Sequence, residues 1–249
     1  MCAAQGGTLV HARGNYSASL LSSQRVCDVI SCMKPIVELQ RLASPVPRPQ
    51  ALYVDGPTLW VSSRATKKLY TIDRAAWKVT SEWNAPDAST PWGITKAGNN
   101  FFAVCGIDLD TVDDRTIRRF VPGQGFDPQF RWMCPNLMGS HLSHTGEALV
   151  LSQWYDKKLF VFDATGQPTC VYNVPHCIVG QCFAHGVFYL ATTDAEETDE
   201  YWLQRLDPAT GRTEPVARIG FSARALAFDG ENFWTNHRDR DQIVSFKLA

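Results

Sequence analysis

The sequence predicts an all-β fold, a five-bladed β-propeller. The first observation behind this prediction is a Gly-centred tight turn that recurs five times, with successive glycines 40 to 48 residues apart. The second is a short apolar or aromatic run after each turn, such as Leu59-Trp60-Val61. A period of this length, with several short strands per unit, is typical of propeller blades. The recurring glycines are Gly56, Gly98, Gly146, Gly186 and Gly230.

Each repeat divides into four short strands, A to D, rich in the β-branched, aromatic and aliphatic residues that strands favour. The predicted A strands are 50–54, 92–95, 141–143, 181–184 and 224–228. The B strands are 58–62, 100–105, 148–153, 187–192 and 232–236. The C strands are 68–72, 115–120, 158–162, 201–206 and 242–246. The D strands are 80–83, 130–133, 170–172 and 215–219, and Asp-containing turn sequences precede most of them.

The fifth repeat ends without a D strand, whereas an orphan strand, 36–40, precedes the first repeat. If 36–40 completes the last blade, both termini close the ring and an exposed sheet edge disappears. Six blades would need shorter repeats than the turn spacing supplies. We therefore predict two regions, a poorly structured N-terminal extension over 1–32 and a propeller over 33–249.

Charge and composition exclude several classes of function. The 249 residues carry 24 Lys and Arg against 25 Asp and Glu, so we expect no nucleic-acid partner, which would require a clustered basic face. No apolar run approaches the roughly 20 residues of a membrane-spanning helix, so we expect no membrane partner. The N-terminus lacks a signal-peptide pattern, and the eight cysteines match no zinc-binding spacing. We expect reduced thiols and a cytoplasmic protein.

Two blade sequences resemble known propellers. The stretches 52–61 (LYVDGPTLWV) and 225–234 (ALAFDGENFW) are similar to blades of the SMP-30/gluconolactonase-like and NHL/glutamine-cyclotransferase-like propellers. The resemblance covers about residues 33–249 and reflects blade packing. For the gluconolactonase group it implies a divalent metal held by Glu, Asn and Asp near the channel, but here Gln50 opens the first inner strand and the third carries His141. We predict no cofactor and no metal ligands, with a divalent metal kept as an alternative.

The inner strands of a propeller line its channel, so their first residues, together with the last residues of the B strands, approach one mouth. Convergent polar groups with an aromatic wall are what a small-molecule pocket needs. Arg224 would hold a carboxylate or phosphate, or else pair with an acidic loop residue such as Asp108 or Asp194. The candidate substrate-binding residues are Gln50, Trp92, Gln153, Trp154, Gln181, Arg224 and Asn236.

Three residues near the predicted mouth are candidates for catalysis. His141 and His237 have ordinary pKa values suited to proton transfer near neutral pH; the alternatives are a hydrogen-bonded channel histidine and a solvated loop histidine. Cys105 would be an activated thiolate if a histidine lay within reach, or otherwise a small buried residue. A further alternative is that Cys105, His141 and His237 bind zinc or copper.

The sequence therefore predicts a small-molecule enzyme of hydrolase, lyase or cyclase type, using acid–base chemistry at the channel mouth. One alternative is a non-catalytic ligand-binding or protein-interaction propeller, and another is a metal-dependent propeller enzyme. No phosphate-binding Gly-rich loop, nucleophile elbow or HExxH motif occurs.

Overall fold

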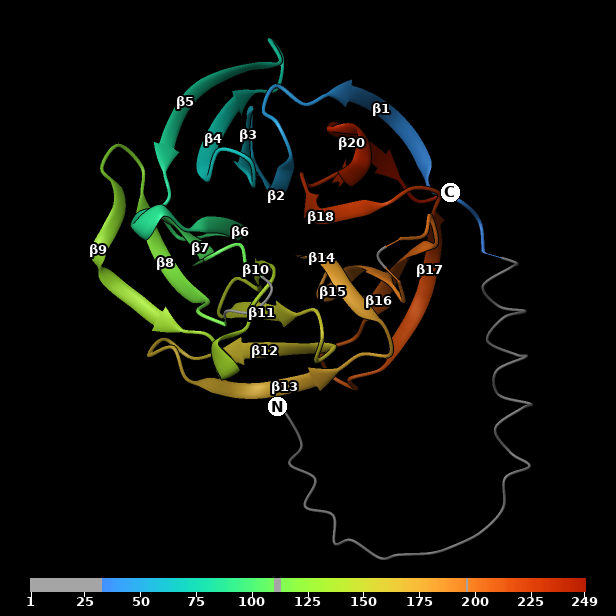
Figure 1. Cartoon of the computed structure of the whole chain (residues 1–249). Helices are drawn as coiled ribbons and strands as arrows, with labels where there is room; N and C mark the ends of the chain where they lie inside the picture. The colour runs from blue at the N-terminus through green and yellow to red at the C-terminus, as the bar shows by residue number, and fades with distance from the viewer. Residues whose placement is uncertain (1–32, 110–112, 196) are drawn as a thin grey trace, which may run out of the picture.

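The computed structural model describes residues 33–109, 113–195 and 197–249. This part of the chain forms five four-stranded antiparallel sheets arranged as blades around one axis (Figure 1). The predicted all-β, five-bladed propeller is confirmed. The same arrangement confirms the predicted resemblance to known propellers at the level of the fold. The predicted extension, 1–32, lies outside the described residues.

The blades follow one another along the chain, and the first strand of each lies nearest the axis. Blade 1 contains β2 (Pro49–Asp55), β3 (Thr58–Ser63), β4 (Lys68–Asp73) and β5 (Lys78–Asn84). Blade 2 contains β6 (Thr90–Ala97), β7 (Asn100–Gly106), β8 (Thr116–Val121) and β9 (Gly125–Met133). Blade 3 contains β10 (Leu142–His144), β11 (Leu149–Gln153), β12 (Lys158–Phe162) and β13 (Pro168–Asn173). Blade 4 contains β14 (Cys177–Ala184), β15 (Val187–Thr193), β16 (Tyr201–Leu206) and β17 (Thr213–Ile219). Blade 5 contains β18 (Ala223–Phe228), β19 (Phe233–His237), β20 (Gln242–Lys247) and β1 (Val37–Ala43).

Blade 5 combines strands from both ends of the described chain. The strand order is β1-β20-β19-β18, and β1 pairs antiparallel with β20, with Val37 opposite Lys247 and Ala43 opposite Gln242. Just before β1, the amide of Ile36 donates to the carbonyl of Arg218 in β17 at 2.9 Å, so the segment also touches blade 4. The outermost strand of blade 5 is therefore β1, which corresponds to the orphan strand predicted before the first repeat.

The recurring glycine has a conformational cause. All five repeat glycines have positive φ, between 57° and 100°. They stand in the turns between the first and second strands, where the chain reverses within two to four residues. A residue with a Cβ is strained in this left-handed region, whereas glycine enters it without steric cost. The period in the sequence is thus the period of the hairpin turns.

The core lies between neighbouring blades. One buried cluster joins Tyr201 and Leu203 of β16 to Phe233 of β19 and Phe246 of β20. Near the axis the inner strands approach closely, and a Cβ placed on Gly93 of β6 would lie 2.7 Å from the Cα of His141. The narrow centre of the ring therefore depends on small residues at the points of closest approach.

Two expectations from the sequence need correction. The inner strand of blade 4 begins at Cys177 rather than at 181, which places Gln181 in the middle of the strand. Cys105, Cys134 and Cys182 have free thiols, but Cys170 is disulfide-bonded, so the expectation of reduced thiols fails for that residue. The only helical elements among the described residues are 3-10 turns at Pro86–Ala88, Pro135–Leu137 and Arg238–Arg240, none long enough to cross a membrane.

Candidate functional site

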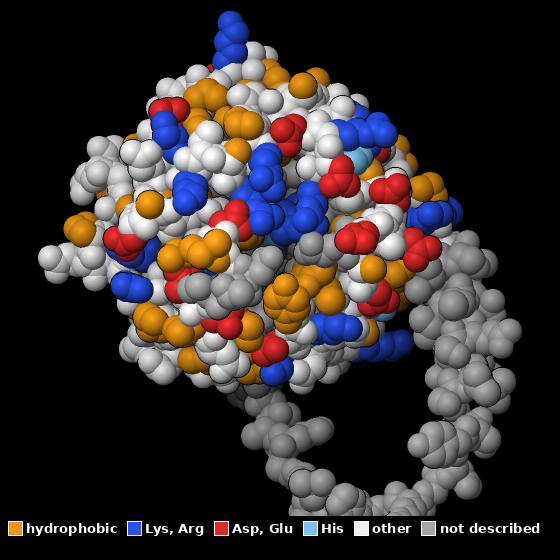
Figure 2. All heavy atoms as spheres, viewed as in Figure 1, with side chains coloured by type: hydrophobic (Ala, Val, Ile, Leu, Met, Phe, Trp, Pro, Cys, Tyr) orange, Lys and Arg blue, Asp and Glu red, His pale blue; other side chains and the backbone are white. Residues whose placement is uncertain are grey.

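A cavity of about 260 Å³ opens at one end of the channel; we call it the mouth cavity. Its polar lining includes Gln50 and His141, and its aromatic lining consists of Trp92, Trp154 and Tyr155. Four arginines also line it, and none of the described lining residues is Asp or Glu. In the same view as Figure 1, Figure 2 shows Lys and Arg side chains gathered over the centre of the ring. The arginines of the cavity are Arg64, Arg115, Arg224 and Arg238.

The positions of these side chains follow from the repeat. Arg64, Trp154 and Arg238 each stand directly after the second strand of a blade, where that strand reaches the mouth. The amides of Arg64 and Arg238 donate to Arg48 and Ser222 respectively, each just before the inner strand of the same blade. Equivalent hydrogen bonds therefore hold equivalent positions of blades 1 and 5 at the edge of the cavity.

The inner strands reach the cavity through irregularities. The register between first and second strands shifts within Pro49–Leu52, Pro91–Gly93, Ile178–Gly180 and Arg224–Ala227. In blade 3, Ser140 and His141 both hydrogen-bond Ser152 through the backbone. A bulge bends a strand and re-aims the side chains beside it. Gln50, Trp92, His141 and Arg224 all stand at these irregularities and all line the cavity.

His141 is buried beside Arg224. Burial, with a smaller contribution from the Arg224 charge, lowers the pKa of His141 to about 3. Both causes disfavour the imidazolium, so the ring is neutral at neutral pH. A neutral imidazole offers one hydrogen-bond donor and one acceptor to a ligand.

Trp92 lies between two guanidinium groups. The Cζ atom of Arg115 is 3.7 Å from the centroid of the Trp92 ring, and that of Arg64 is 5.3 Å away. Burial lowers the pKa of Arg115 to about 10, which leaves it protonated at neutral pH. Its Nη1 atom is buried and has no hydrogen-bond partner among the described residues. Leaving a buried charged donor unsatisfied is costly, so a ligand acceptor would be strongly favoured there.

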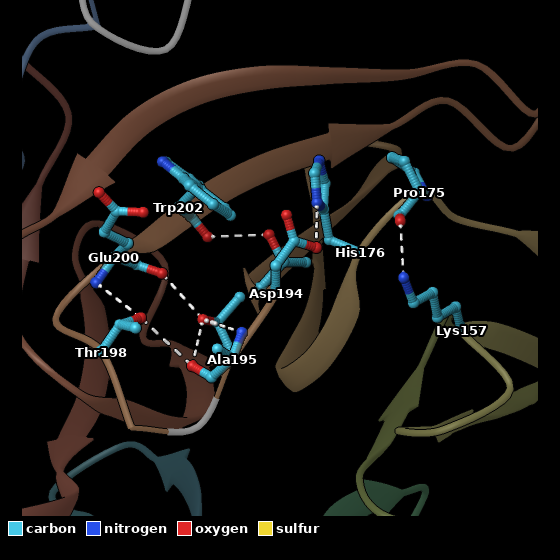
Figure 3. Close-up of polar contacts among 10 residues, drawn as sticks. Lys157, Pro175, His176, Asp194, Ala195, Thr198, Glu200 and Trp202 are labelled. Atoms are coloured by element: carbon cyan, nitrogen blue, oxygen red, sulfur yellow. Dashed lines mark hydrogen bonds and ion pairs between the residues drawn. The ribbon is translucent and has the colours of Figure 1, made fainter. Parts of the chain in front are cut away.

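Asp108 and Asp194, the two loop residues considered as partners of Arg224, contact other side chains. Asp108 accepts two hydrogen bonds from Arg64, at 2.6 and 2.7 Å. Asp194 lies 2.8 Å from Nδ1 of His176 (Figure 3). In the same loop, Thr193 Oγ1 donates to the carbonyls of Ala195 and Glu200 at 2.9 and 2.8 Å. Asp108 therefore pairs with Arg64 of the mouth cavity, whereas Asp194 contacts His176 in blade 4.

Of the ten residues that the sequence predicts for the site, five line the mouth cavity: Gln50, Trp92, His141, Trp154 and Arg224. The structure shows that these five residues line one cavity, and their roles in binding and catalysis stay predictions.

The remaining amides lie elsewhere. Gln153 is buried, and its Nε2 donates to the carbonyls of Pro135 and Met138 at 2.6 and 2.9 Å. Gln181 donates across blades to the carbonyls of His141 and Val150, and it faces a cavity of about 100 Å³ towards the other end of the channel. Asn236 is fully buried in β19. Both side chains thus bridge backbone segments: Gln153 ends β11 as predicted but turns to the 135–138 segment, whereas Gln181 lies in the middle of a strand that begins earlier than predicted.

His237 faces a different pocket. It stacks on Phe221, with ring centroids 5.0 Å apart, and lines a cavity of about 360 Å³ with Arg41, Asp199 and Asp239. Burial, with Arg41 and Arg240 nearby, lowers its pKa below the ordinary value. The geometry therefore does not bring His141 and His237 into one catalytic pair.

Cys105 is also apart from the mouth cavity. It is buried, and that burial raises the pKa of its thiol to about 12 despite the nearby Arg118. A thiol with this pKa is protonated at neutral pH and is a poor nucleophile. The geometry supports the alternative interpretation of Cys105 as a small buried residue.

Sequence reasoning did not select Arg64, Arg115 and Arg238 as site residues. A usable signal was present for two of them, because Arg64, Trp154 and Arg238 occupy the same position of their repeats, immediately after the second strand. Arg115 gives no such signal, since it precedes β8 at the end of an inserted loop.

The donor set of the mouth cavity does not fit a divalent cation. Calcium and magnesium take oxygen ligands, predominantly carboxylates, whereas the described lining offers four guanidinium groups. No group of three or more His, Cys, Asp or Glu side chains in the described ranges is arranged to hold a metal ion. We derive no chemical step through a metal.

Comparison with known proteins identifies the fold. No family model matches the sequence, and no curated protein matches it. The structure of glutaminyl cyclase from Myxococcus xanthus is similar, with a TM-score of 0.66 and 13% identity over 86% of this chain and 98% of that chain. The calcium-binding protein regucalcin from Agrobacterium tumefaciens gives 0.57 and 10% over 86% and 95%. The PQQ-bound aldose sugar dehydrogenase from Streptomyces coelicolor gives 0.52 and 13% over 86% and 98%. At these identities the likeness shows a propeller shared with enzymes and with a calcium-binding protein.

Proposed function

We propose that the protein is an enzyme that acts on a small organic anion in the mouth cavity, by acid–base chemistry of hydrolase, lyase or cyclase type. The observation that carries the proposal is the convergence of four arginines and the His141 imidazole in one cavity whose described lining has no carboxylate, although Arg64 is paired with Asp108 beside that lining. Fixed positive charge in a partly buried site favours anions and disfavours cations. Arginine, in particular, matches the planar geometry of carboxylate and phosphate.

Ligand binding would prepare His141 for proton transfer. In the free protein, burial and Arg224 keep its pKa at about 3. An anion bound by Arg224 offsets the positive charge of that guanidinium and adds a negative charge beside the imidazole. Both changes favour the protonated ring, so the pKa of His141 rises when the anion binds. His141 would then accept a proton from the bound substrate and return it to the product, while Gln50 orients the ligand.

A substrate screen tests this proposal. The purified protein is incubated with small carboxylates, lactones and phosphate esters, and conversion is followed by mass spectrometry. We expect His141→Gln to abolish conversion while retaining binding, and Arg224→Gln to weaken binding. If a substrate is found and His141→Gln turns it over at the wild-type rate, the acid–base assignment is wrong.

A second candidate function is anion binding without chemistry. The low pKa of His141 favours it, because an imidazole with a pKa of about 3 is a weak base at neutral pH. NMR titration of His141 with and without 50 mM phosphate, a concentration on the order of a weak binding site, separates the two. A pKa raised by at least one unit shows that the anion binds beside His141, and conversion of a compound in the substrate screen then supports the enzyme. An unchanged pKa alongside measurable phosphate binding supports a binding protein.

A further inference from the structure

The arginines of the mouth cavity lie on one side of it, together with Trp92, whereas Trp154 and Tyr155 lie on the other side. Arg224 and Arg238 come from blade 5, Arg64 from blade 1 and Arg115 from the start of blade 2. These three blades are consecutive around the ring (Figure 1). Blades 3 and 4 contribute no arginine to the cavity, and their lining side chains include Trp154, Tyr155 and Ile178. A ligand that fills the cavity would therefore meet charge on one side and apolar surface on the other.

The apolar surface continues outside the cavity. Tyr155 lines the cavity and is nevertheless 79% exposed. Ile107 and Leu109, in the loop that contacts Trp92 and Arg64, are 40% and 57% exposed. Tyr155 therefore offers exposed aromatic surface at the edge of the cavity, which a ligand longer than the cavity could cover.

The positions of Ile107 and Leu109 are set by contacts to the cavity. The carbonyl of Gly106 accepts a hydrogen bond from Nε1 of Trp92 at 3.3 Å, which holds the residue before Ile107 on the indole. The amide of Ile107 donates to the Asp114 carboxylate at 2.9 Å. Asp108, between the two apolar residues, is held by Arg64. Two of these contacts, those to Trp92 and Arg64, attach the loop that carries Ile107 and Leu109 to the cavity wall.

We propose that the ligand of this site is an amphipathic organic anion. Its carboxylate or phosphate lies among the arginines of blades 5, 1 and 2, and its aliphatic or aromatic body lies on Trp154 and on the exposed side chain of Tyr155. This inference rests on the proposed function and specifies its substrate class. The cavity of about 260 Å³ lies just below the usual range for ligand sites, so an extended body must leave it and cover exposed side chains.

The test is a series of linear carboxylates, acetate, butanoate, hexanoate and octanoate, measured by isothermal titration calorimetry at fixed ionic strength. Octanamide serves as the uncharged control. Burial of one methylene is worth up to about a fourfold gain in affinity, so we expect affinity to rise two- to fourfold per added carbon. Octanamide should bind at least tenfold more weakly than octanoate, because it lacks the charge that the arginines hold.

Two variants separate the halves of the site. Tyr155→Ser should flatten the dependence on chain length, whereas Arg224→Gln should weaken every carboxylate by a similar factor. Val171→Ser, which removes another exposed apolar side chain on the outer strand β13, is the matched control and should change neither.

The outcomes distinguish this inference from the proposed function. If acetate and octanoate bind equally well, or Tyr155→Ser leaves the chain-length series unchanged, the amphipathic ligand is wrong and the small-anion site stands. If no carboxylate of any length binds, and inorganic phosphate also fails to bind, the anion site and the proposed function both fail. If octanamide and octanoate bound equally well, the site would bind its ligand through apolar contacts alone, and the role of the arginines would be wrong.

Discussion

Gly180 of β14 packs directly against the backbone of Ala225 in β18. A Cβ placed on Gly180 would lie 2.3 Å from the carbonyl carbon of Ala225. Ala225 has a positive φ of 62° and stands within the register shift that follows Arg224. The Thr235 hydroxyl donates to its carbonyl at 2.8 Å. The contact between blades 4 and 5 therefore holds the irregularity that presents Arg224 to the mouth cavity.

Substitution of Gly180 by Ala tests this relationship. The added methyl group would force the two backbones apart, and overpacking of this kind costs about 2–3 kcal/mol. We expect a lower free energy of unfolding in urea and weaker binding of carboxylates. Gly220→Ala is the matched control, since Gly220 has no heavy atom within 4 Å of a Cβ position. Equal stability of the two variants would show that the strands at the centre are not closely packed.

Substitution of Arg115 by Met tests the stack on Trp92. The variant keeps an unbranched side chain over the indole and removes the buried charge with its unpartnered Nη1. Hydrogen bonds to charged groups contribute about 1.5–3 kcal/mol, so we expect acetate and phosphate to bind roughly tenfold more weakly by calorimetry. Arg131→Met, on the outer strand β9, is the control. Unchanged affinity in Arg115→Met would remove Arg115 from the anion site.

Acid should destabilise the protein through His141. Its pKa is about 3 when folded, against 6.5 for the ordinary value, so between these values the unfolded chain binds one more proton than the native state. Stability from this residue is complete above pH 6.5 and is lost as the pH falls towards 3, at about 1.4 kcal/mol per unit.

Urea unfolding at pH 4, 5, 6 and 7 measures this slope. We expect His141→Gln to have a shallower dependence on pH than the wild type. His237 also has a lowered pKa, so some slope remains in the variant and His237→Gln provides a comparison. Parallel curves for wild type and His141→Gln would contradict the buried, neutral state of His141.

Closure of blade 5 can be tested by truncation. A chain that starts at Met33 keeps β1, whereas a chain that starts at Ser44 lacks it and exposes the edge of β20. Because Cys170 is disulfide-bonded, all chains are compared in the presence of a reductant. We then expect the first to match the full chain in melting temperature, as the sequence prediction for 1–32 requires. The second should melt at lower temperature and aggregate, because unpaired strand edges associate. A stable, monomeric protein without β1 would show that closure is dispensable.

Several features of the site were predictable because they follow the repeat. The inner-strand residues Gln50, Trp92, His141 and Arg224 stand where the period places the mouth, and all line one cavity. Gln181 was misplaced because the start of an eight-residue strand was set four residues late. His237 was misplaced because its ring stacks on Phe221. The spacing of the repeats does not predict such a side-chain contact.

The sequence by itself determined the number of blades, the strand order and the end of the ring that carries the cavity. It did so because hairpin turns with positive φ impose glycine at a regular interval. Only the tertiary structure decided which polar groups share a pocket, and it gave His141 its low pKa and buried the thiol of Cys105. Those properties depend on bulges, contacts between blades and desolvation, which bring together residues far apart in the chain.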